Sequence, residues 1–195
     1  MLRSGAMESP AREIALICHP GTRSSAVRGI RASVARTADG MLTLRYVLEG
    51  DLDRLRVPPA RTPRIAVRLW EHTCCEIFVA RRGAPAYHEF NFAPSGEWAA
   101  YAFSRYRDGG ILADETLNPD IAVRRTAGEL ELDARVRLAQ LSPMHVSAGL
   151  SLGLSAVVED DDSGTLSYWA LKHPSGRPDF HHPDGFTLEF DEVRD

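Results

Sequence analysis

The feature that most constrains the fold is a strict alternation of apolar and polar side chains within short segments. In residues 41–48 every second side chain is Leu or Tyr, so one face is apolar with a period of two residues. Similar segments recur along most of the chain at a spacing of about 8–12 residues, with turn residues between them. The predicted strands cover residues 13–18, 26–36, 41–48, 73–80, 86–92, 97–103, 120–126, 129–138, 146–158 and 186–190.

The spacing of these segments predicts an all-β fold. No amphipathic helical segment separates them, which argues against parallel β-α-β units. Short antiparallel strands with frequent turns are typical of a sandwich or a barrel. We expect at most a short helix, near residues 138–143 or 51–56, and a loop at the Pro-rich residues 57–63.

Length and composition indicate one ordinary globular domain. The chain has 195 residues, of which 44% are hydrophobic and 26% charged. We expect residues 12–195 to form a single β-sandwich domain. Residues 1–11 are expected to be a disordered lead-in.

Charge and hydropathy argue against several kinds of partner. The formal net charge of -4 argues against nucleic-acid binding, which usually requires a strongly basic face. No stretch approaches the roughly 20 apolar residues that cross a bilayer, so we expect no membrane association. The first residues lack the apolar core of a secretory signal, and a cytoplasmic location is the resulting expectation.

The three cysteines, Cys18, Cys74 and Cys75, are an odd number and predict free thiols. Cys74 and Cys75 are adjacent in a predicted strand, so their side chains point to opposite faces. A disulfide between them would require a distorted backbone. We interpret them as packed thiols, with a redox or metal-binding pair as the alternative.

Two neighbouring strands each carry a carboxylate in the middle of one face. Glu76 lies in segment 73–80, and Glu89 shares a face with Asn91 in segment 86–92. The opposite faces hold the side chains expected in the core, which are Cys75, Ile77, Val79, His88, Phe90 and Phe92. If the segments pair as a hairpin, both glutamates share one surface. They then repel unless a cation, an arginine or ligand hydroxyls lie between them. A solvated outer face with arginine neighbours is the alternative.

The sequence carries no recognisable catalytic motif. It lacks a G-x-S-x-G elbow and a Gly-rich phosphate loop, and we predict no cofactor. One group of side chains nevertheless contains the atoms for a metal site, although no spacing matches a metal-binding pattern. Its members are His72, His88, His173, His181 and His182, with Glu71, Glu76 and Asp179. A metal-dependent hydrolase that uses this His/Glu cluster is the alternative to a binding function.

Four stretches of the chain carry a resemblance to a known group. In residues 69–79, Trp70 is followed after five residues by Glu76, Ile77 and Phe78. This run resembles the W-x5-E-[IVL]-F strand of family 9 carbohydrate-binding modules and the related DOMON-like domains. The strand, turn and C-terminal closing segment of that superfamily resemble residues 87–98, 168–174 and 178–186. These motifs are similar to those of a bacterial MurB-like DOMON branch, whose label suggests a cell-wall context.

The resemblance implies a two-sheet antiparallel sandwich, jelly-roll-like, that binds a saccharide without catalysis. In sugar-binding members two aromatic side chains clamp a sugar ring while polar strand residues take its hydroxyls. Carried onto this chain, the clamp candidates are Trp70 and Trp169, with Glu76 as the strand carboxylate. Both tryptophans are expected at the rim of the face that holds the glutamates, with core or edge packing as the alternative. Further binding candidates are Glu89, Asn91 and Lys172.

Some DOMON-type relatives bind haem through a Met together with a Lys or His. Under that alternative, the axial ligands in this chain would be Met144 with His145, or Met41.

Overall fold

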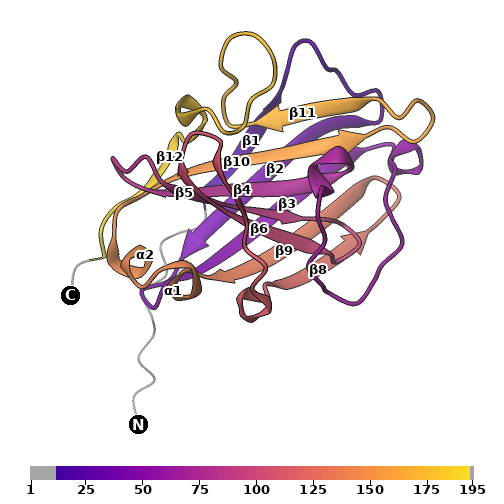
Figure 1. Cartoon of the computed structure of the whole chain (residues 1–195). Coiled ribbons are helices and arrows are strands. Elements are labelled where there is room, and N and C mark those ends of the chain that lie inside the picture. Colours follow the sequence, from indigo (N-terminus) through magenta and orange to yellow (C-terminus); the bar gives the residue numbers. More distant parts are fainter. Residues whose placement is uncertain (1–11, 194–195) are drawn as a thin grey trace.

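The computed structural model describes residues 12–193, and nearly all of its regular structure is antiparallel β (Figure 1). The predicted lead-in, residues 1–11, lies outside the described residues. The strands are β1 (Arg12–Cys18), β2 (Val27–Arg36), β3 (Met41–Gly50), β4 (Cys74–Arg81), β5 (Tyr87–Phe92), β6 (Trp98–Arg105), β7 (Asp108–Ile111), β8 (Asp120–Arg125), β9 (Glu129–Arg137), β10 (Leu150–Glu159), β11 (Leu166–Ala170) and β12 (Leu188–Phe190).

The helical elements are single turns: η1 (Leu52–Arg54), η2 (Leu69–Glu71), η3 (Glu115–Leu117), α1 (Leu138–Leu141), α2 (Met144–Ser147) and η4 (Pro183–Gly185). No helix within residues 12–193 is long and apolar enough to span a membrane.

The strands form two layers that are joined through β1. The first sheet has the order β7-β6-β5-β4-β10-β11, with β12 paired to the beginning of β10. The second sheet has the order β1-β2-β3-β9-β8. The last residues of β1 pair with β11, which links the sheets. The prediction of an all-β antiparallel sandwich is confirmed.

The two sheets pack face to face around one apolar core. In β3 the alternate residues Leu42, Leu44, Tyr46 and Leu48 are fully buried, as the two-residue period predicts. They pack in one cluster with the inner faces of β4, β5 and β10. The Tyr46 hydroxyl crosses between the layers and donates a 2.6 Å hydrogen bond to the backbone carbonyl of Glu76. This bond ties the second sheet to the strand that carries the predicted binding carboxylate.

The observed strands differ from the predicted ones in three places. Predicted strand 146–158 begins only at Leu150, because residues after Pro143 form the α2 turn. Strand β7 is absent from the prediction, since two of its four residues are Gly and all four are exposed. Strand β11 is also absent from it, because its five residues are too few to show a clear period. The short helix expected near residues 138–143 is confirmed by α1.

The adjacent thiols of β4 lie on opposite faces of the first sheet. Cys75 is buried in the core between the sheets, whereas Cys74 is buried in a separate apolar cluster on the outer face of the first sheet. Cys18, Cys74 and Cys75 are all free. The two adjacent side chains therefore point to opposite faces, as predicted.

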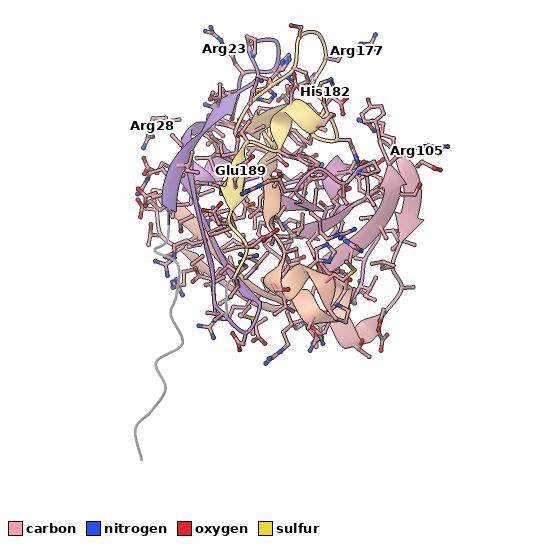
Figure 2. All side chains as sticks on the ribbon, turned by 90° about the vertical axis from the view of Figure 1, so that its left-hand side faces the viewer. Arg23, Arg28, Arg105, Arg177, His182 and Glu189 are labelled. Atoms are coloured by element: carbon pink, nitrogen blue, oxygen red, sulfur yellow. The ribbon has the colours of Figure 1, made fainter. Side chains whose placement is uncertain are left out.

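Residues 171–187, here called the closing segment, cover part of the outer face of the first sheet. Figure 2 shows this part of the chain in yellow, running from the loop at Arg177 past His182 toward Glu189 of β12. Its Phe186 ring stacks on Phe78 of β4, with 5.5 Å between the ring centroids.

Close approach of this segment depends on a glycine in β10. A Cβ atom at Gly153 would come within 2.8 Å of the Phe186 ring and within 3.4 Å of the Phe78 side chain. A glycine inside a strand often marks such a close contact. Gly153 therefore allows the closing segment to seat against the sheet.

We predict that Gly153→Ala lowers the free energy of unfolding by about 1–3 kcal/mol, because the added methyl forces Phe186 to move. Urea denaturation measures this change. Gly29→Ala in β2 is the matched control, since a Cβ atom there meets nothing within 4 Å, and it should not destabilise the protein. Equal stability of the Gly153 variant and wild type would show that the closing segment is not seated as described.

Candidate functional site

A cavity of about 410 Å³ opens on the outer face of the first sheet. Strands β4, β5, β6, β10 and β11 form its floor, while η2, the β6–β7 turn, β7 and the closing segment form its walls. The strand register decides which side chains reach the floor. Phe78 pairs with Glu89, which pairs with Tyr101, so these three form one row across the sheet. In the next row Glu76 pairs with Asn91.

Two carboxyl groups form the polar centre of this floor. Glu76 and Glu89 are only 2% and 5% exposed. Glu76 accepts hydrogen bonds from the Ser155 hydroxyl at 3.1 Å and the Cys74 thiol at 3.4 Å. Glu89 accepts one from the Asn91 amide at 2.9 Å. All of these hydrogen-bond donors are neutral.

Burial controls the protonation of the pair. It raises the pKa of both carboxyls, and the charge of Glu89 raises the pKa of Glu76 further. The hydrogen bond from Asn91 and the more distant charge of Arg107 oppose the rise at Glu89 but do not outweigh burial. The Arg107 guanidinium is held 2.8 Å from Asp179 instead. The pair therefore keeps protons at pH values where exposed glutamates are ionised.

Aromatic rings surround the carboxyls. Trp70 of η2 is 39% exposed and meets Tyr101 edge to face, with 5.7 Å between the ring centroids. Phe180 of the closing segment packs against Tyr168 of β11 at 5.9 Å. Phe78 and Phe103 also line the cavity. The cavity thus offers aromatic rings around two carboxyl groups.

A partly buried histidine connects the closing segment to the floor. Nδ1 of His181 lies 2.8 Å from the Tyr87 hydroxyl, which itself accepts a hydrogen bond from the backbone N–H of Arg107. The hydroxyl hydrogen can therefore point to Nδ1, which leaves the ring proton on Nε2, 3.7 Å from a Glu89 oxygen. Burial lowers the pKa of His181 to about 4, so the ring is neutral near pH 7.

The structure brings together part of the predicted site. Trp70, Glu76 and Glu89 all line the cavity, and Asn91 is hydrogen-bonded to Glu89. The prediction that Glu76, Glu89 and Asn91 share one face is confirmed by the register. The residues predicted for the opposite face, Ile77, Val79, Phe90 and Phe92, lie in the core between the sheets.

The predicted position of Trp169 at the rim is wrong. Trp169 pairs with Ala156, which pairs with Cys75, and this row faces the core between the sheets. Its ring is therefore buried, with Nε1 donating a 3.0 Å hydrogen bond to the Ser167 hydroxyl. The residue before it, Tyr168, lines the cavity. Trp98 also lies in this core.

Lys172 is also placed away from the cavity. Its ammonium group lies 3.9 Å from an Asp184 oxygen at the surface of the closing segment. It borders a separate small hollow and does not line the large cavity. The structure does not bring it together with the glutamates.

The histidines expected in a metal site lie apart, each with its own partner. His72 contacts Glu159, and His88 packs against His145. His173 donates to the backbone carbonyl of Ile17. Among residues 12–193, no three His, Cys, Asp or Glu side chains are placed to hold a metal ion. The His/Glu cluster proposed for a metal-dependent hydrolase therefore does not form.

The residues considered for haem ligation do not form a site either. Met144 on α2 is exposed, whereas His145 next to it is buried against His88. Met41 begins β3 on the second sheet. None of the three lines the cavity.

Sequence reasoning missed several cavity residues. In the predicted strand 97–103, Trp98 and Ala100 face the core. The alternation of the strand therefore could have placed Tyr101 and Phe103 on the outer face. Arg107, Phe180 and His181 come from turns without a periodic pattern. Only the tertiary structure brings these three to the cavity.

No family model matches the sequence, and no curated protein does. The chain shares its fold with a solved structure from Bacteroides uniformis ATCC 8492, provisionally described as a carbohydrate-binding protein. The TM-score is 0.66 at 14% identity, covering 91% of this chain and 84% of that one. Two solved structures of a family 9 carbohydrate-binding module from Caldicellulosiruptor kristjanssonii are more distant. The one with glucose has a TM-score of 0.47 at 10% identity, covering 79% of this chain and 71% of that one. The one with cellotriose has a TM-score of 0.46 at 12% identity, covering 80% and 72%.

We predict that Glu76→Gln stabilises the protein at alkaline pH. Between the ordinary carboxyl pKa and the raised pKa, the folded protein binds more protons than the unfolded chain, so stability falls as pH rises through this window. The amide removes that titration. We expect the free energy of unfolding to increase by about 1–3 kcal/mol at about pH 8, and by less at about pH 5.

Urea denaturation of wild type and variant at the two pH values measures the difference. Glu71→Gln is the matched control, because Glu71 is an exposed partner of Arg68 and its loss should bring no gain. A Glu76 variant that is less stable than wild type at both pH values would contradict the claim that Glu76 is buried without a neutralising positive charge.

Proposed function

We propose that this protein is a non-catalytic saccharide-binding β-sandwich whose ligand occupies the cavity over β4, β5 and β6. The observation that carries the proposal is the combination of a ring-lined opening with two hydrogen-bonding carboxyls at its floor. A pyranose ring has the same two-sided chemistry. Its C–H faces pack on aromatic rings, and its hydroxyls donate to carboxylates.

The size of the cavity supports a small ligand. Its volume of about 410 Å³ lies within the range of roughly 300–1,000 Å³ that is usual for small-molecule sites. Trp70 is the ring most free to stack on a sugar, because it is partly exposed at the mouth and contacts Tyr101 by an edge only. Glu76 and Glu89 would then take hydroxyl groups deeper in the cavity.

The proposal also includes the branch of the superfamily, the kind of saccharide and the location of the protein. The motifs in residues 69–79 and 178–186 support a DOMON-like, jelly-roll-like domain of the MurB-like branch. A cell-wall saccharide follows from that resemblance as a proposal, and the cytoplasmic location expected from the sequence stays a proposal. The shared fold with a protein provisionally described as carbohydrate-binding makes saccharides the first ligand class to test.

We predict that Trp70→Ala weakens binding of a saccharide about ten- to a hundredfold, which corresponds to about 1–3 kcal/mol. Isothermal titration with mono- and disaccharides on both proteins measures the effect. Because Trp70 is partly exposed, the variant should remain folded. Recovered saccharide should be chemically unchanged, since no catalysis is proposed.

Val67→Ala is the matched control. It lies in the same loop, is 62% exposed and does not line the cavity, so binding should stay at the wild-type level. Absence of binding to every saccharide, or equal binding by wild type and the Trp70 variant, would overturn the proposal.

A further inference from the structure

We propose that the saccharide carries a protonated amino group, which binds between Glu76 and Glu89 at the floor of the cavity. This inference rests on the proposed function and narrows its ligand class to amino sugars with a free amine. Its basis is the balance of charge and hydrogen bonds around the two carboxyls.

The described residues supply no positive charge that neutralises the pair. The groups facing the glutamates come from every neighbouring element: Cys74 on β4, Asn91 on β5, Tyr101 on β6, Ser155 on β10, Tyr168 on β11, His181 on the closing segment and Arg107 on the β6–β7 turn. Of these, only Arg107 carries a permanent positive charge, and its guanidinium binds Asp179 at 2.8 Å.

Arg107 is kept in this position by its surroundings. Asp179 also accepts a 2.7 Å hydrogen bond from the Tyr106 hydroxyl, and the Arg107 guanidinium lies over the Tyr106 ring. The backbone N–H of Arg107 donates to Tyr87. The one available cation among the described residues around the pair is thus committed at the wall, and the pair at the floor is left for a positive group of the ligand.

One unused acceptor at the edge of the pair points the same way. Asn91 is fully buried, and its Oδ1 atom has no hydrogen-bond partner within the described part of the chain. Asn91 already donates to Glu89 and pairs in register with Glu76, so its side chain lies beside both carboxyls, behind the residues that line the cavity. An ammonium group offers three N–H donors and no acceptor, which suits a site rich in oxygen acceptors.

The aromatic walls favour an organic ammonium over a metal ion. Cations are attracted to the faces of aromatic rings, and the cavity is lined by Trp70, Tyr101, Phe103, Tyr168 and Phe180. A calcium ion would require about 6–8 oxygen ligands, far more than the two carboxyls supply. An amine attached to a sugar ring uses the carboxyls and the rings at the same time.

Binding of an ammonium group should also displace protons. Burial raises the pKa of both glutamates, so the free pair holds a proton near neutral pH. A positive group between them favours the ionised carboxylates. Binding of the amine is then accompanied by release of protons from the carboxyls. Binding of a neutral sugar should release far fewer protons.

Isothermal titration near neutral pH tests the inference with three disaccharides of the same β-1,4 linkage: the glucosamine dimer, cellobiose and N,N′-diacetylchitobiose. We expect the glucosamine dimer to bind at least about tenfold more tightly than the other two. Titration in two buffers of different ionisation enthalpy should show proton release for this ligand.

Glu76→Gln and Glu89→Gln should each lower the affinity for the glucosamine dimer much more than the affinity for cellobiose, and so remove most of this preference. Glu71→Gln, one residue from Trp70 but outside the cavity, should keep the preference. Circular dichroism confirms that each variant is folded.

Three outcomes would overturn the inference. Equal affinity for cellobiose and the glucosamine dimer would show that the amine is not recognised, while the proposal of saccharide binding would stand. An amine preference that survives both glutamine variants places the amine elsewhere. Failure of all three disaccharides and of the wider saccharide panel overturns the proposed function and this inference together.

Discussion

The repulsion between two buried carboxyl groups on one face of a sheet is the interaction on which the rest of this structure depends. Glu76 and Glu89 are nearly inaccessible to solvent and are bound only by neutral donors within the described part of the chain. Such a pair opposes folding, because burial disfavours its charge. The apolar core on the other face of the same strands offsets that cost. A functional site commonly lowers stability in this way.

The elements around the two carboxyls cover them from solvent but place no positive charge next to them. Gly153 lets the closing segment approach the sheet, and His181 then lies against the floor as a neutral ring. Asp179 draws Arg107 to the wall and away from the glutamates. The contacts that form the cavity therefore leave the carboxyls free to bind hydrogen-bond donors or positive groups of a ligand. The aromatic rings add surfaces on which a sugar can stack.

Strand parity explains how much of this could be predicted from the sequence. Residues 73–80 and 86–92 alternate clearly, so the shared face of Glu76, Glu89 and Asn91 follows from the residue pattern alone, and the register agrees with it. The position of Trp169 does not follow in the same way, because its short strand has too few residues to assign a face. The sheet register puts Tyr168 in the cavity instead. Arg107 and His181 lie in turns, where no period exists, and only tertiary contacts decide their positions.

The most direct test of this account is an NMR titration of the side-chain carboxyl carbons of Glu76 and Glu89, assigned with the single glutamine variants. The account predicts that both carbons titrate above the range of exposed glutamates, and that each substitution lowers the midpoint of the remaining one because the repulsion is gone. Two independent titrations at the ordinary midpoint, about 4.3, would contradict it. That result would mean that the carboxyls are solvated or already neutralised.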